Sequence, residues 1–238
     1  QIHRVYWLDA IAEDPAIVQA MAPALQRVRD MQAAPLGVYL QTAMPRTGDP
    51  ESPLGNLFAD ALRGAVKGAD IAINNNSRGG LRTDLPDGEL TFGRLYDVFP
   101  FDNRLVRLTV TGAELTRVFE NEIRRNRRGA LGISGVRVEA DCAGAGLHVA
   151  LYRPSGEPIK PDETLVVATM DSLVSGSIFS VFSSPQEFHV PEDAPLVREA
   201  VEDWLRQRGG QLDADQFVDR DHRRWELPDT HAASCAQP

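Results

Sequence analysis

The chain has 238 residues, 42% of them hydrophobic and 25% charged, which is enough for one or two globular domains with a hydrophobic core. Its 34 acidic residues outnumber its 25 basic residues and give a formal net charge of −9. This balance argues against a nucleic-acid polymer as partner, since such binders neutralise phosphates with clustered cations, and no apolar run is long enough for a membrane-spanning helix.

The first predicted element is a helix over residues 14–33. Asp14 and Pro15 have the residue types of an N-cap followed by a proline in the first turn, and apolar residues then recur at helical spacing: Ile17, Met21, Leu25 and Val28. Pro23 should kink this helix. Because the helix precedes the first strand, we interpret it as a linker helix.

A β-rich segment follows at residues 36–42, and then a polar loop. Ser52-Pro53 opens the next helix, whose apolar stripe consists of Leu54, Phe58, Leu62 and Ala65. Residues 70–89 begin as a short buried strand and continue as a polar segment with two adjacent glycines. That segment is too rich in turn-forming residues for a helix or a strand interior.

The second half of the chain mixes helices with short strands. Residues 104–110 alternate like a strand, and Thr111 and Glu114 then form a capping-box pattern before an apolar helix. Residues 130–169 are predicted to hold three or four short strands, and residues 194–207 a last helix. The mixture indicates an α+β fold rather than a doubly wound sheet. The tail, residues 229–238, is predicted to be disordered.

The sequence lacks the residue patterns of common catalytic centres. None of its five histidines lies in a metal-binding spacing, and GxSxG and P-loop patterns are absent. We therefore expect no catalytic residue and no metal site in this chain. The two cysteines, Cys142 and Cys235, could form one bridge in an oxidising compartment or be two unrelated thiols.

Three segments, in order, carry a family resemblance: ESPLGNLFADAL at residues 51–62, NSRGGLR at 76–82 and FPFDNRLVRLTVTGAEL at 99–115. Together they resemble the C-terminal domain of the 5′-nucleotidase and UDP-sugar hydrolase family, over about residues 36–182. The resemblance implies an α+β domain of layered α/β/β/α type that recognises the substrate. We assign it residues 36–228.

In that family a separate N-terminal metallophosphatase domain supplies a pair of divalent metal ions, such as Zn²⁺ or Mn²⁺, and the attacking water. The resemblance implies that this chain lacks that domain and works with it as a partner. Residues 1–35 would be the end of the catalytic domain and the linker helix, and the start at Gln1 suggests a fragment of a longer protein. The resemblance also implies a periplasmic or secreted location and a nucleotide or nucleoside as the small-molecule ligand.

The glycine-rich loop provides the first site residues that the resemblance implies. Arg82 matches the family arginine that binds the phosphate side of the nucleotide, a role suited to the forked guanidinium. Gly79 and Gly80 match glycines that bring the backbone close to the ligand. Arg78 stands where the family has a third glycine.

Two further positions near this loop depart from the family pattern. Ser77 occupies the usual asparagine position, and Asn76 lies one step upstream. The family arginine before the ES-x-LGN segment is replaced by Pro50, and Arg46 could substitute for it.

The segment Phe101-Asp102-Asn103 provides the base-binding residues. By resemblance, Phe101 stacks on the nucleobase and Asn103 hydrogen-bonds it, while Asp102 replaces a glycine. The second stacking ring is missing, because Ser172 falls at its position, unless Phe179 or Phe182 substitutes. This departure leaves two alternatives open: an interaction module that kept the fold but lost nucleotide recognition, and a hydrolase domain for a non-nucleotide substrate.

Overall fold

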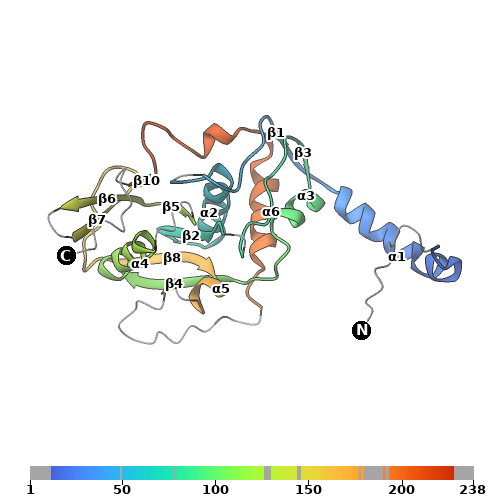
Figure 1. Cartoon of the computed structure of the whole chain (residues 1–238), viewed down its shortest axis with the longest axis horizontal. Helices are drawn as coiled ribbons and strands as arrows, with labels where there is room; N and C mark the ends of the chain where they lie inside the picture. Colours follow the sequence, from blue (N-terminus) through green and yellow to red (C-terminus); the bar gives the residue numbers. More distant parts are fainter. Residues whose placement is uncertain are drawn as a thin grey trace, which may run out of the picture.

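The computed structural model describes residues 12–48, 50–77, 79–125, 130–143, 146–176, 178–179, 190 and 193–227 (Figure 1). Its helices are α1 (Pro15–Ala33), α2 (Pro53–Ala65), α3 (Phe92–Val98), α4 (Gly112–Arg124), α5 (Asp171–Val174), α6 (Val197–Arg208) and the 3-10 helix η3 (Ala214–Gln216). Its strands are β1 (Pro35–Leu40), β2 (Ile71–Asn75), β3 (Gly88–Thr91), β4 (Leu105–Thr111), β5 (Leu131–Ser134), β6 (Arg137–Ala143), β7 (Gly146–Tyr152), β8 (Thr164–Met170), β9 (Gly210–Leu212) and β10 (Trp225–Glu226). The predicted α+β fold is confirmed.

Local sequence signals place most helix starts correctly. The Asp14 side chain accepts hydrogen bonds from the first-turn amides of α1, Ser52 caps α2, and Thr111 forms the predicted capping box with Glu114 at α4. Helix α6 begins later than predicted, because Leu196 forms an extended bridge with Arg104 before the helix starts.

β3 and α3 are among the elements that were not predicted from the sequence, together with α5, β9, η3 and β10. β3 pairs antiparallel with β1, a partner about fifty residues earlier in the chain. The Thr91 hydroxyl then accepts a hydrogen bond from the amide of Arg94 and starts α3 directly from the strand. The strand depends on a distant partner, so local composition alone predicts a loop here.

The central sheet has the strand order β4-β8-β2-β5. β2 and β8 are parallel, and both β4 and β5 run antiparallel to their neighbours. The carboxyl ends of β2 and β8 therefore lie at the same edge as the beginnings of β4 and β5. Four connecting segments meet at this edge, which we call the loop edge.

Two smaller sheets, β3-β1-β9 and β10-β6-β7, lie on either side of this centre (Figure 1). Helix α2 packs on β2 and β5, and α6 packs on α2 and β1, so that one hydrophobic core joins the elements. Cys142 on β6 is disulfide-bonded; Cys235 and the predicted disordered tail lie outside the described residues.

Helix α1 projects away from the rest of the chain (Figure 1). It continues through Pro23, none of its residues is buried, and its end touches α3 where Gln32 lies against Gly93. Its apolar side chains are exposed: Ile17, Val18, Met21, Leu25, Val28 and Met31. Neither α1 nor any other helix in the described ranges is both long and apolar enough to cross a bilayer.

Helix α2 and strand β5 approach so closely that a methyl group does not fit between them. A Cβ on Gly132 would lie 2.1 Å from the carbonyl oxygen of Gly55. We therefore expect Gly132→Ala to lower the free energy of unfolding by about 1–3 kcal/mol, the usual cost of overpacking. Urea denaturation measures this change.

The matched control is Gly146→Ala, since a Cβ there meets no atom within 4 Å. Equal stability of Gly132→Ala and the wild type would contradict the described contact between α2 and β5.

Candidate functional site

The loop edge of the central sheet brings the predicted site segments together. Residues 76–82 follow β2, residues 99–104 precede β4, and residues 171–176 follow β8. The backbone links these segments, because the Asp171 amide donates to the Arg104 carbonyl and the Arg82 amide donates to the Val98 carbonyl. The convergence follows from the strand directions and not from sequence proximity.

The glycine-rich segment forms a tight turn. The Asn75 side chain accepts a hydrogen bond from the Ser77 amide, and the Gly80 amide donates to the Ser77 carbonyl at 2.8 Å. A Cβ on Gly80 would lie 1.9 Å from the Asn75 carbonyl oxygen, so only glycine fits there. Gly79 is exposed, and its amide donates to the Ser77 hydroxyl at 3.3 Å. The turn places Arg82 at the loop edge, where its side chain is exposed.

Arg82 and Phe101 lie together at this edge. The guanidinium carbon of Arg82 is 5.7 Å from the centroid of the Phe101 ring, within range of a cation–π contact. Phe101 is partly buried and packs edge-on against the buried ring of Phe99, with centroids 5.5 Å apart. The site therefore combines an oriented aromatic ring with an exposed forked cation.

Asn103 is held by the segment that follows β8. Its amide nitrogen donates to the Asp171 carboxylate at 2.9 Å, and the same oxygen accepts from the Ser172 amide at 2.7 Å. Asn103, Asp171 and Ser172 line an open depression of about 440 Å³ together with Val174, Ser175 and Val190.

Arg198 on α6 is a residue of this site that sequence reasoning missed. It is 8% exposed, and its guanidinium donates to the carbonyl oxygens of Phe99 and Phe101 and to the Asp102 carboxylate. The same group lies 4.9 Å from the centroid of the Tyr96 ring. One buried cation thus fixes the backbone on either side of the base-stacking candidate. In the sequence, Arg198 is only an arginine beside the apolar stripe of a helix, and that pattern does not indicate these contacts.

The remaining residues predicted for the site are Asn76, Ser77, Arg46 and Arg78. Asn76 is buried, and its side-chain oxygen accepts from the side-chain amide of Asn74 at 2.9 Å, so the Asn76 side chain faces the interior between α2 and β5. Ser77 is exposed beside the turn. The Arg46 backbone amide donates to the Asp84 carboxylate, which places the Arg46 loop next to the segment that follows Arg82. Arg78 lies outside the described residues.

Among the described residues after β8, none supplies an exposed second ring. Ser172 is exposed, while Ile178 and Phe179 are buried in the hydrophobic core. Phe182 lies outside the described residues. Among the residues that the structure does describe, no three histidine, cysteine or carboxylate side chains gather in a way that could hold a metal ion.

Glu51, at the start of the first family motif, is a buried carboxyl group. Its Oε2 atom accepts from the side-chain amide of Asn56 at 2.9 Å, and the Glu51 side chain is buried. Burial raises the pKa of Glu51, and the Asn56 hydrogen bond and the positive charges of Arg224 and Arg223 only partly oppose that shift.

This raised pKa predicts a pH dependence of stability. The folded chain binds a proton at Glu51 more tightly than the unfolded chain, so the free energy of unfolding falls as pH rises from about 4.5 to the raised pKa. Glu51→Gln should remove this slope, which is at most about 1.4 kcal/mol per pH unit. Urea denaturation from acidic to neutral pH measures it.

Exposed Glu157→Gln serves as the control and should keep the slope of the wild type. A Glu51→Gln curve parallel to that of the wild type at every pH would contradict the assignment.

Comparison with known proteins identifies a matching family and several relatives. Residues 31–183 match the family described as "5′-nucleotidase, C-terminal domain". The chain is 32% identical over 131 residues to "Endonuclease YhcR" of Bacillus subtilis, covering 55% of this chain and 10% of that protein. It is 32% identical over 147 residues to "Cell wall protein Lmo0130" of Listeria monocytogenes, covering 56% of this chain and 19% of that protein.

A solved structure shows the same fold. The 5′-nucleotidase precursor from Thermus thermophilus superposes with a TM-score of 0.68 at 23% identity, covering 93% of this chain and 45% of that one. The chain thus spans less than half of this structure and a fifth or less of the two relatives above.

Proposed function

The chain belongs to the 5′-nucleotidase C-terminal domain family, and from this premise we propose that it is the substrate-recognition domain of a metal-dependent phosphoester hydrolase. The observation that carries the proposal is the contact between Arg82 and Phe101 at the loop edge. An aromatic ring suits the flat face of a base, and a guanidinium suits phosphate oxygens. We therefore propose a nucleotide or nucleoside as the ligand.

In this proposal the chain binds and orients the substrate and leaves the chemistry to another domain. Phe101 stacks on the base, Asn103 hydrogen-bonds it and Arg82 binds the phosphate side, with Gly79 and Gly80 close to the ligand. Arg198 keeps Phe101 and Asp102 in place. A pair of divalent metal ions in an N-terminal metallophosphatase domain would activate the attacking water, and positioning the substrate against it contributes several kcal/mol.

The domain organisation is part of the proposal. Residues 1–35 would end the catalytic domain and link it to the recognition domain at 36–228. The exposed apolar side of α1 supports a role as a linker that contacts another domain. A secreted or periplasmic location is supported by the disulfide at Cys142, since disulfides persist in oxidising compartments, and by the name of the Listeria cell wall relative.

One observation favours the second candidate, a binding module without nucleotide recognition. Ser172 is exposed where the family has its second ring, and Phe179 is buried in the core. Base stacking would then rest on Phe101 alone. A hydrolase domain for a non-nucleotide substrate is compatible with the same observation.

The proposal is tested by assaying phosphatase activity with Mn²⁺ or Zn²⁺ and a panel of nucleotides, using the 238-residue chain and a longer protein that includes a metallophosphatase domain. We expect turnover only by the longer protein, and less of it after Arg82→Ala. Metal-dependent turnover by the 238 residues alone would contradict the assignment of the chemistry to another domain.

A further inference from the structure

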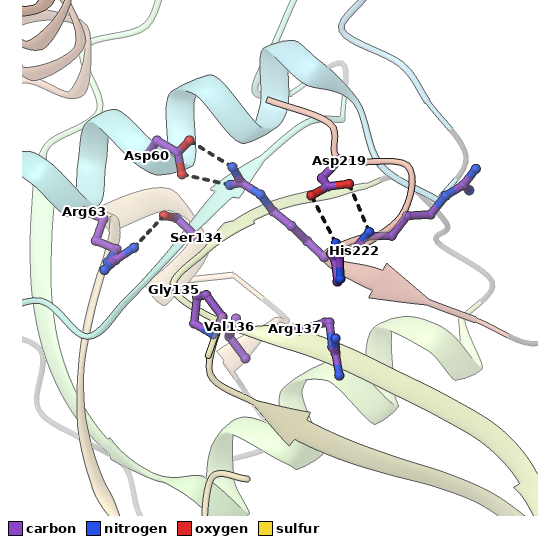
Figure 2. Close-up of a pocket in the computed structure, with 11 residues that line it drawn as sticks. Asp60, Arg63, Ser134, Gly135, Val136, Arg137, Asp219 and His222 are labelled. Atoms are coloured by element: carbon purple, nitrogen blue, oxygen red, sulfur yellow. Dashed lines mark hydrogen bonds and ion pairs between the residues drawn. The ribbon is translucent and has the colours of Figure 1, made fainter. Parts of the chain in front are cut away.

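A second charged cavity lies at the opposite end of the central sheet from Arg82 and Phe101. On β5, Leu131 pairs with Asn75 at the loop edge, whereas Ser134 pairs with Ala72 at the far end of β2. Ser134 lines a cavity of about 470 Å³ that α2, the β5–β6 turn and the segment before β10 enclose (Figure 2). The cavity is therefore separate from the proposed nucleotide site.

One wall of this cavity is fixed by a structural ion pair. Arg224 donates both terminal nitrogens to the Asp60 carboxylate, at 2.8 and 2.9 Å, the two bonds drawn at Asp60 in Figure 2. It also donates to the Ile133 carbonyl. The floor is a turn at Gly135, which has a φ of 77° and no room for a Cβ because the Asp70 carbonyl oxygen would lie 2.1 Å away. The cavity is thus held in shape by the chain itself.

Other arginines that line the cavity keep donors available. Among the described residues, Arg63 forms only a long hydrogen bond, 3.4 Å, to the Ser134 hydroxyl. Across the described part of the chain, neither Arg63 nor Arg223 forms an ion pair, and both are exposed. Arg137 is paired with Glu139 and its guanidinium lies 5.4 Å from the centroid of the Tyr152 ring, so Arg63 and Arg223 are the arginines of the cavity with donors to spare. Guanidinium donors without acceptors are suited to an anion.

The negative groups that face the cavity compensate for only part of this charge. Asp60 is occupied by Arg224 and Glu139 is paired with Arg137. Glu51 does not line the cavity but is close enough to Arg223 and Arg224 to interact with their charges. Asp219 accepts hydrogen bonds from the amides of Asp221 and His222, and its side chain is 59% exposed, so its charge is screened by solvent. Four arginines therefore face two lining carboxylates, in a chain whose net charge is −9.

We propose that this cavity binds a phosphate-class anion, with Arg63 as its main contact and Arg223 as a further donor. Figure 2 shows Arg63 on one side of the cavity and Arg137 on the other, with Ser134 and Gly135 between them. The anion is either free phosphate or the terminal group of a phosphate monoester. This site is independent of the proposed nucleotide recognition at the loop edge.

The test is calorimetric titration of the 238-residue chain with inorganic phosphate and, separately, with glycerol 3-phosphate, at constant ionic strength. We expect millimolar binding that Arg63→Gln weakens about tenfold, the size expected for one charge-assisted hydrogen bond. Binding of inorganic phosphate alone identifies the free ion as the ligand class, and equal binding of both identifies a terminal phosphate group.

One variant separates this cavity from general charge effects. Lys67→Gln removes a cation from the adjacent depression beside Arg63. It should bind phosphate as the wild type does, and the amide resonances of Gly135 and Val136 should shift on titration of the wild type. The proposal is overturned if millimolar phosphate and glycerol 3-phosphate do not bind, or if Arg63→Gln binds them as tightly as Lys67→Gln does.

Discussion

Replacing Arg198 with methionine should lower the free energy of unfolding by about 2–4 kcal/mol, because it leaves the carbonyl oxygens of Phe99 and Phe101 without their buried donor. Methionine keeps much of the apolar stem that packs in the core, so the lost hydrogen bonds dominate the change. Urea denaturation of the wild type and the variant measures it.

The control is Arg107→Met on β4, an exposed arginine in the middle of a strand, which should change stability by less than about 0.5 kcal/mol. Arg198→Lys should fall between wild type and Arg198→Met, since an ammonium keeps the charge but cannot fork between several acceptors. Equal stability of Arg198→Met and Arg107→Met would show that Arg198 does not hold this segment.

Replacing Phe101 with alanine should weaken the binding of AMP by about fivefold to 150-fold, since stacking on one base contributes about 1–3 kcal/mol. The ring is partly buried and oriented by Phe99, so little ordering is needed when a base stacks on it. Calorimetric titration of the 238-residue chain gives the affinities.

Arg82→Ala should distinguish recognition of the phosphate from recognition of the nucleoside. Because the guanidinium is assigned to the phosphate side, this variant should lose affinity for AMP and keep most of its affinity for adenosine.

The matched control for Phe101→Ala is Tyr39→Ala, which removes an aromatic residue that is 52% exposed on β1. If Phe101→Ala and Tyr39→Ala bind AMP equally well, Phe101 is not the stacking residue.

The parts of the fold that could be predicted are those stabilised by interactions between residues close together in the sequence. Asp14, Ser52 and the pair Thr111 and Glu114 cap helices through hydrogen bonds to residues three or fewer positions away, so their patterns are readable in the sequence. β3 was missed because its stabilising partner is β1, which no local pattern reveals. Pairing between strands that lie far apart in the chain cannot be predicted from the local pattern of either strand.

The candidate site divides in the same way. The positions of Arg82 and Phe101 follow from the family resemblance, and the structure brings the two side chains within contact distance. Arg198 lies about a hundred residues from the carbonyl groups that it binds. Likewise, the cavity beside Arg63 joins α2 to a segment more than 150 residues away. Neither could be inferred without the tertiary arrangement.

The most direct test of substrate recognition is to titrate the 238-residue chain with AMP, with adenosine and with ribose 5-phosphate, which lacks the base. Recognition of a nucleotide predicts that AMP and adenosine bind, that ribose 5-phosphate binds much more weakly than AMP, and that Phe101→Ala removes this difference. Absence of binding by AMP and adenosine, or equal binding of AMP and ribose 5-phosphate, would contradict nucleotide recognition and favour the interaction module or a non-nucleotide substrate.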